Sequence, residues 1–430
     1  MPCSPDQRSA ALSVLTNPPD NRLLTEVNSC VHCGLCAESC MYYLATRDEK
    51  FIPARKVELV SALHRRYCTA GGRILPWLTG ARELDDAAIG EMTDLFFGAC
   101  TGCGRCTLHC SIGVDIAYLV RTGRTMLSRM GNVPATLQST ITAALQTGNN
   151  MGIPAGEFTD TLSWLQDELR DEVGDPAAEI PLDQPGRRLL YTLNPREPKF
   201  FPLSISAMAK IFYAAGESWT LSTRMYDVTN YAFFSGNGDE AAVIARRLYE
   251  ETGILGAQRC VLAECGHGSR AFRWEGPNYL KTPYPFEVLT SVELLAEYIR
   301  DGRIKLDSGR NTELVTLHDP CNLVRMGGIV AEQRYVLNHA VKNFVEMTPH
   351  GIDNFCCGGG GGQLAMSEYA DRRMKIAEIK AEQIRRTGAA VVVTPCHNCV
   401  DQLMQIENRF KLGVKIRTLG EIVADALILD

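Results

Sequence analysis

Two short runs of cysteine dominate the first third of the chain. "CVHCGLCAESC" and "CTGCGRCTLHC" both have the spacing C-x2-C-x2-C-x3-C. In this spacing, three close thiolates hold one [4Fe–4S] cube while the fourth cysteine crosses to the other cube. The pattern therefore predicts two cubane clusters with crossed ligation. The first set is Cys30, Cys33, Cys36 and Cys110, and the second is Cys100, Cys103, Cys106 and Cys40.

Zinc is the main alternative for clustered cysteines. Structural zinc prefers two separated C-x2-C pairs, whereas each run here places four cysteines at even spacing, and the run occurs twice. The spacing is that of bacterial ferredoxins, although Met41 and Ser111 stand where those proteins usually have proline. Residues 53–67, between the runs, have the apolar periodicity of a helix. We expect an N-terminal extension over residues 1–19 and a helical ferredoxin-type domain over residues 20–130.

The rest of the chain contains an internal repeat. After a linker over residues 131–188 that is rich in Pro, Gly, Asp and Asn, "RRLLYTLNP" matches "TELVTLHDPC". Further along, "FFSGNGDEA" matches "FCCGGGGGQ", and "RCVLAECGHG" matches "AVVVTPCHNC". Each copy gives an apolar strand, a glycine-rich turn that opens a helix, and another strand, which indicates an α/β unit with a mainly parallel sheet. We expect a first unit over residues 189–300 and a second over residues 301–430.

The second copy carries five cysteines at strand ends or turns, where one fold can bring them together. They are Cys321, Cys356, Cys357, Cys396 and Cys399. The pattern C…CCG…C-x2-C resembles the cysteine-rich CCG domain of heterodisulfide reductase-like proteins of the HdrD type, and the chain looks most similar to their DsrK, HmcF and TmcB group. The resemblance implies a non-cubane [4Fe–4S] cluster on these five cysteines. The expected fold is α+β and multidomain: a helical ferredoxin-type domain with two [4Fe–4S] clusters, followed by a duplicated α/β CCG-type domain.

The first copy lacks most of these ligands. Phe234 and Ser235 occupy the positions of the adjacent cysteines, Gly268 replaces the last one, and only Cys265 remains, opposite Cys396. We therefore expect three clusters in the chain and none in the first unit. Cys265 either takes part in thiol–disulfide exchange beside the remaining cluster or is a relic of the lost site, and the sequence leaves both interpretations open.

Three histidines lie close to these cysteines in the sequence. His267 follows Cys265 by two residues, while His318 and His397 flank predicted ligands. Histidine can supply protons near neutral pH, but hydrogen bonds that tune a cluster are the interpretation we favour for the latter two. The candidate catalytic residues are Cys265, His267, His318 and His397.

Composition and one further motif limit the other functions. "SGNGDEA" imitates a dinucleotide-binding fingerprint, but the repeat explains its glycines better, so we expect no flavin or nicotinamide. A net charge of -6 argues against nucleic acid as a partner. The N-terminus has no signal-peptide pattern, and no apolar run reaches the length of a membrane span. Residues 200–216 are apolar nearly all round and are expected to form a buried helix rather than a membrane-docking face.

The resemblance also implies a function. It implies a cytoplasmic iron–sulfur subunit, peripheral on the cytoplasmic face of the inner membrane through its partner subunits, in a respiratory redox complex. Electrons would pass between an integral membrane cytochrome b subunit and a disulfide or thiol substrate, such as a small thiol/disulfide carrier protein. One alternative is a pure electron relay. Another is the iron–sulfur subunit of a glycolate or lactate dehydrogenase, although such subunits usually keep both CCG units.

Overall fold

The computed structural model describes residues 4–18 and 21–429, so the expected extension over residues 1–19 lies partly outside the described residues. The chain divides into two compact units. Unit 1 contains Met1–Ser139 and two short later segments, Tyr231–Gly238 and Gly358–Ile379. Unit 2 contains Thr140–Asn230, Asp239–Cys357 and Lys380–Asp430. The glycine-rich turns of both repeats thus belong to unit 1, which the sequence did not predict.

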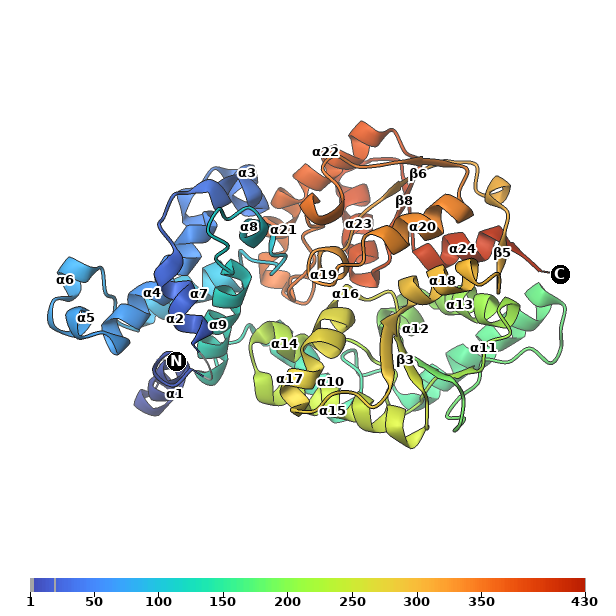
Figure 1. Cartoon of the computed structure of the whole chain (residues 1–430), viewed down its shortest axis with the longest axis horizontal. Helices are drawn as coiled ribbons and strands as arrows, with labels where there is room; N and C mark the ends of the chain where they lie inside the picture. The colour runs from blue at the N-terminus through green and yellow to red at the C-terminus, as the bar shows by residue number, and fades with distance from the viewer. Residues whose placement is uncertain (1–3, 19–20, 430) are drawn as a thin grey trace. The chain divides into compact units, whose positions relative to one another are not determined.

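Unit 1 is helical throughout its regular structure in the described residues (Figure 1). The helix expected between the cysteine runs is present as α4 (Pro53–Cys68), which begins at a proline as helices often do. Its buried face packs against neighbouring helices. These neighbours are α1 (Pro5–Thr16), α2 (Arg22–Ser29), α7 (Asp86–Phe96) and α9 (Ile116–Arg129). Short elements complete the unit: η1 (Leu35–Ser39), α3 (Met41–Thr46), η2 (Glu49–Phe51), α5 (Ala70–Ile74), α6 (Pro76–Thr79), α8 (Arg105–Leu108), α14 (Tyr231–Ser235), η6 (Ser367–Tyr369) and α21 (Ala370–Ile376).

Unit 2 contains two four-stranded sheets of the same topology, both parallel throughout. The first has the order β2-β1-β3-β4 and the second the order β7-β6-β8-β9. The first sheet consists of β1 (Leu189–Tyr191), β2 (Trp219–Thr220), β3 (Arg259–Leu262) and β4 (Glu287–Thr290). The second consists of β6 (Leu314–Leu317), β7 (Asn343–Val345), β8 (Val391–Val393) and β9 (Lys415–Arg417). This confirms the expected fold class.

The repeat extends to the helices that follow the last strand of each sheet. α18 (Ser291–Arg300) follows β4, and α24 (Leu419–Ala426) follows β9. Each begins with a threonine–glutamate capping box, in which the Thr hydroxyl and the Glu carboxylate satisfy backbone N–H groups at the helix start. The antiparallel pair β5 (Lys305–Leu306) and β10 (Leu427–Ile428) joins the start and the end of the second repeat. Buried apolar residues of both sheets form one continuous core.

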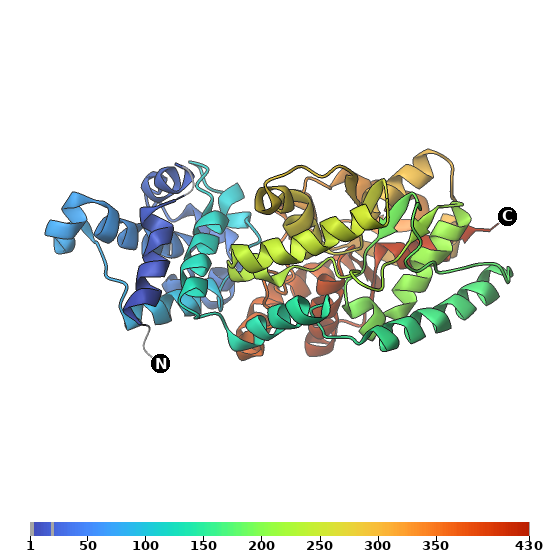
Figure 2. The ribbon, with the colours of Figure 1, turned by 90° about the horizontal axis from the view of Figure 1, so that it is seen from below.

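The remaining helices of unit 2 cover the sheets, and several are visible in Figure 1 and Figure 2. α13 (Pro202–Ala214) is largely buried, which confirms the expected buried helix. The expected linker contains α10 (Ala135–Thr147) and α11 (Ala155–Val173), and the apolar face of α11 joins the common core. The domain boundaries at residues 130, 188 and 300 stay predictions. The other helices are α12 (Arg196–Phe200), α15 (Gly238–Ile254), α16 (Gly266–Gly268), η3 (Ser269–Trp274), α17 (Gly276–Leu280), η4 (Ser308–Arg310), α19 (Cys321–Val324), α20 (Ala331–Ala340), η5 (Gly351–Asp353), α22 (Glu378–Thr387) and α23 (His397–Phe410).

Candidate iron–sulfur centres

The first predicted set of four cysteines surrounds one small cavity in unit 1. Cys30, Cys33, Cys36 and Cys110 all line it, together with apolar side chains. Burial raises the pKa of Cys36 to about 11, and the other three thiolates of the set contribute to this rise because they lie close by. Four thiolates this close repel one another, so the cationic core of an iron–sulfur cluster fits this donor set. The fold thus places Cys110, from the second run, beside the first three cysteines of the first run.

The second predicted set lies together in the same unit. Burial raises the pKa of Cys106 well above its ordinary value, and Cys103, Cys40 and Cys100 raise it further. Gly102 and Gly104 have φ of +64° and +71°, which L side chains rarely adopt, and they let the loop turn between ligands. Cys40 therefore lies with the second run, as crossed ligation requires. The role of each cysteine as a ligand stays a prediction.

The five cysteines of the second repeat converge in unit 2. The Sγ atoms of Cys321 and Cys356 are 4.0 Å apart, and those of Cys357 and Cys399 are 3.4 Å apart. The Cys396 and Cys399 side chains also form a hydrogen bond. All five are buried. The end of β6, the CCG turn and the start of α23 each supply part of this cluster of thiols, which we call the CCG site.

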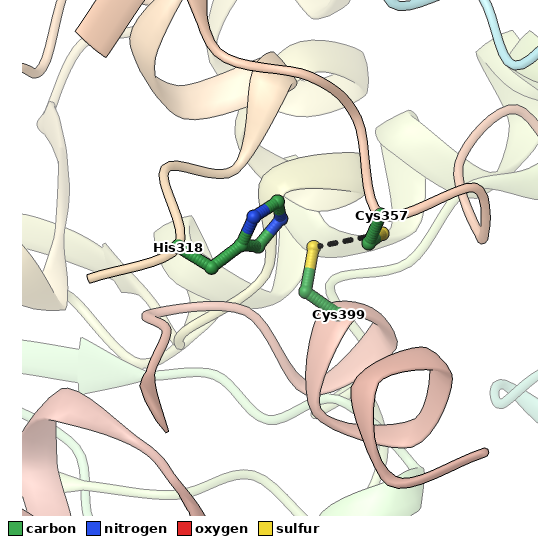
Figure 3. Close-up of side chains that lie close together, drawn as sticks. All are labelled: His318, Cys357 and Cys399. Carbon is green, nitrogen blue, oxygen red and sulfur yellow. Dashed lines mark hydrogen bonds between the residues drawn. The ribbon is translucent and has the colours of Figure 1, made fainter. Parts of the chain in front are cut away.

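His318 lies at the CCG site, immediately after β6 (Figure 3). One ring nitrogen and the Sγ atoms of Cys357 and Cys399 all lie within 4.8 Å of one another. The ring is buried, and neither nitrogen has a hydrogen-bond partner among the described residues. Buried polar atoms almost always have partners, so these two nitrogens indicate a missing group. The donor set and the unpartnered ring together fit an iron–sulfur cluster.

Lys380 is a residue of this site that the sequence did not reveal. It lies in α22 and is fully buried, and its Nζ atom is 3.8 Å from the Met347 Sδ atom. Burial lowers the pKa of Lys380 to about 8, while Cys357 and two other cysteines of the site act in the opposite direction. A buried ammonium here stabilises negative sulfur. A lysine within a helix carries no sequence signal for this role.

The structure places Cys265 beside the CCG site. The backbone N–H of the next residue, Gly266, donates to the Cys396 Sγ atom at 3.4 Å. The Cys265 Sγ atom itself accepts hydrogen bonds from Asn194 at 3.4 Å and Gly268 at 3.3 Å. Burial raises the pKa of Cys265 well above its ordinary value, with Cys396 contributing. The first repeat thus brings its one remaining thiol to the ligands of the second, although its role stays a prediction.

The other two histidines differ from His318 because protein groups bind their rings. The His397 Nε2 atom lies 3.0 Å from the Ser204 Oγ atom, and its Nδ1 atom lies 3.2 Å from the Glu264 carbonyl oxygen. His267 is hydrogen-bonded to Asn398. Burial lowers the pKa of His267 to about 3 and that of His397 to about 4. Both rings are held as neutral hydrogen-bonding groups near the site.

Comparison with known proteins agrees with this arrangement. Residues 26–114 match the 4Fe-4S dicluster domain, and residues 315–404 match the cysteine-rich CCG domain. The chain is 28% identical to the Hdr-like menaquinol oxidoreductase iron-sulfur subunit 2 of Archaeoglobus fulgidus, over 93% of this chain and 79% of the relative. It is 27% identical to a subunit of the dihydromethanophenazine:CoB--CoM heterodisulfide reductase of Methanosarcina mazei, over 95% of each chain. It is 23% identical to the EtfAB:quinone oxidoreductase of Syntrophomonas wolfei, over 88% of this chain and 55% of the relative.

In the described part of the chain, we find no helix with the length and apolar character needed to cross a bilayer. The two matched domains coincide with the cysteine sets that the structure brings together in unit 1 and unit 2. Iron–sulfur clusters and electron transfer are therefore the chemistry of this chain. The resemblance to the heterodisulfide reductase-like proteins of the HdrD type is confirmed: the chain combines a 4Fe-4S dicluster domain with a CCG domain, and it is similar to proteins named as Hdr-like and heterodisulfide reductase subunits.

Proposed function

We propose that this chain is the iron–sulfur subunit of a membrane-associated respiratory redox complex, acting at its CCG site on a disulfide or thiol substrate. The observation that carries the proposal is the convergence of five buried cysteines with the unpartnered ring of His318. The names of relatives that oxidise menaquinol or reduce a heterodisulfide support it. When bound, two cubane clusters and one non-cubane cluster supply one-electron transfer.

The chain's own residues suit a reaction of sulfur. Reduction of a disulfide takes two electrons and two protons and releases two thiols. Lys380 supplies a buried positive charge beside the thiols, and His318 presents ring nitrogens that no described residue uses. A neutral imidazole has one N–H donor and one acceptor, so His318 can hydrogen-bond a sulfur atom of the bound group. We assign it this positioning role.

Addition of candidate thiols to the oxidised protein tests the proposal directly. If a substrate sulfur binds at the CCG site, EPR spectroscopy will show a new paramagnetic signal that depends on the thiol. Replacement of His318 by glutamine should alter that signal and leave the cubane signals of the reduced protein unchanged. A spectrum that no thiol changes would contradict sulfur chemistry at this site.

Replacement of Cys265 by serine is expected to abolish thiol–disulfide turnover while iron content stays unchanged. The reason is its position: the residue next to it is hydrogen-bonded to Cys396, and it is not one of the predicted ligands. Turnover is measured with a reduced dye as electron donor and a small disulfide as acceptor. Cys260→Ser is the matched control, because Cys260 is equally buried, in β3, and is not one of the predicted ligands. Unchanged turnover in Cys265→Ser would show that Cys265 is a relic.

A pure electron relay is the second candidate. The burial of all five CCG cysteines favours it, since a relay needs no access for a substrate. The same EPR experiment separates the two functions, because a relay predicts no signal that depends on added thiol.

An exposed apolar segment is the candidate contact with an integral membrane cytochrome b subunit on the cytoplasmic face of the inner membrane. Trp77 and Leu78 in α6 are 77% and 74% exposed, and residues 69–82 contain no acidic residue. Exposed apolar clusters of this kind mark interaction sites, and Trp is enriched where binding energy concentrates.

Double replacement of Trp77 and Leu78 by serine is expected to release the protein from native membranes, because it removes the apolar contact without touching a predicted cluster ligand. The measurement is the fraction of protein that sediments with the membranes of the producing cell. Trp164→Ser is the matched control, since Trp164 is 47% exposed on α11. Equal sedimentation of the double variant and the control would exclude this segment as the contact.

A further inference from the structure

The loop that carries Cys100 in unit 1 is held by two buried cations. We propose that Lys56 and Arg124 raise the reduction potential of the second cube, held by Cys40, Cys100, Cys103 and Cys106, above that of the first, so that an electron shared by the pair rests on the second cube. This inference requires only the two cubane clusters. It does not depend on chemistry at the CCG site.

Lys56 reaches this loop from α4. Its side chain is 2% exposed, and its Nζ atom donates to the carbonyl oxygen of Ala99, directly before Cys100, at 2.6 Å. Burial acts to lower the pKa of Lys56, but the thiolates of the second set outweigh burial and raise it. The ammonium group therefore lies directly beside the loop that carries a predicted ligand of the second cube.

Arg124 reaches the same loop from α9. It is 3% exposed, and its Nη2 atom donates to the carbonyl oxygens of Cys100 and Phe96, both at 2.8 Å. Its Nη1 atom donates to the carbonyl oxygens of Phe234 at 2.6 Å and Gly361 at 2.9 Å. Every one of these acceptors is a neutral backbone carbonyl.

Neither cation has an ion pair with a carboxylate among the described residues. Two buried positive charges without a counter-ion are costly to a protein. A cluster with four thiolate ligands is a negative group at the right place to compensate them. Because reduction adds one more negative charge to the cluster, nearby fixed cations favour the reduced form.

Near the first cube, by contrast, the structure places a carboxylate, that of Glu58, which is itself paired with a cation. Glu58 lies close enough to Cys30 to raise its pKa, after burial and neighbouring thiolates. It also pairs with His32 at 3.4 Å and with Arg65. Cys33 of this set is exposed, whereas Cys40 and Cys106 of the second set are partly buried. Burial by itself disfavours the more negative reduced form of the second cube, so the two cations must more than offset that effect.

A redox titration followed by EPR measures both cubes in one sample. Cys33→Ser alters the signal of the first cube and so assigns the two spectra. The expected result in the unchanged protein is a higher midpoint potential for the second cube. Lys56→Met should lower the midpoint potential of the second cube and leave the first unchanged. Lys50→Met, which removes an exposed lysine near the start of α4, should change neither.

Two results would overturn the proposal: a second cube with the lower midpoint potential, or a Lys56→Met variant that keeps its iron and its potential. If Lys56→Met loses iron, the midpoint potentials of a Glu58→Gln variant test the proposal instead. Removal of this carboxylate should raise the midpoint potential of the first cube alone and narrow the gap between the two. A gap that Glu58→Gln leaves unchanged would show that fixed charges do not set the order.

Discussion

Replacement of Cys357 by serine is expected to lower the iron content from about 12 to about 8 atoms per chain, because one four-iron cluster of three is lost. The Cys357 Sγ atom lies 3.4 Å from the Cys399 Sγ atom and also close to His318. It therefore takes part in the densest part of the CCG site. The measurement is iron and acid-labile sulfide per protein, with EPR of the reduced sample to show that both cubane signals persist.

Cys260→Ser is the control for the loss of iron, because it alters an equally buried thiol in the same unit. It should retain about 12 iron atoms per chain. Retention of all the iron in Cys357→Ser would contradict the role of Cys357 as a ligand. About 16 iron atoms in the unchanged protein would mean that the first repeat also holds a cluster, although only Cys265 remains there.

Replacement of Arg124 by leucine is expected to lower the free energy of unfolding by about 4 kcal/mol or more, since each orphaned buried carbonyl costs about 1–3 kcal/mol. The guanidinium donates to the carbonyls of Phe96, Cys100, Phe234 and Gly361. These acceptors come from all three chain segments that form unit 1. Without the guanidinium, the two later segments of unit 1 lose their hydrogen bonds to Arg124 in the first segment.

Urea unfolding of the whole protein, followed by circular dichroism, measures this effect. Arg129→Leu is the matched control on the same helix, because Arg129 bonds to Ser13 and Ala10 near the surface. Its loss should cost no more than about 1 kcal/mol. Equal stability of the two variants would show that Arg124 does not hold the three segments of unit 1 together.

The sequence predicted those parts of the fold and site that repeat. The two matching cysteine runs predicted which cysteines lie together in unit 1, and the repeated strands and turns predicted two similar parallel sheets. Residues such as Lys56, Lys380 and Arg124 could not be found this way. Each is a single cation in an ordinary helix, and it acquires its role only through contacts with residues far away in the sequence. Burial of an unpaired cation is a tertiary property that periodicity does not encode.

The assignment of the glycine-rich turns to unit 1 was also beyond the sequence. From the sequence, each turn is assigned to the same unit as the strands that flank it. Only tertiary packing reveals which backbone segments the turn contacts. At Gly361, where φ is +63°, a Cβ atom would lie 2.5 Å from the Thr101 carbonyl oxygen. At Gly236, where φ is +85°, it would lie 2.5 Å from the Thr125 backbone nitrogen. Both turns therefore need glycine, because the backbone of the first segment of unit 1 lies against them at Thr101 and Thr125.

In these two turns, the architecture of the repeat does not depend on its thiols. Arg124 binds the backbone carbonyls of Phe234 and Gly361, one from each copy, and makes no use of the cysteine side chains that one copy lacks. The main-chain contact therefore constrains both turns whether or not cysteine side chains are present. The same separation makes the first copy a scaffold for redesign, in which cysteines can be introduced at Phe234 and Ser235 without rebuilding the turn that presents them.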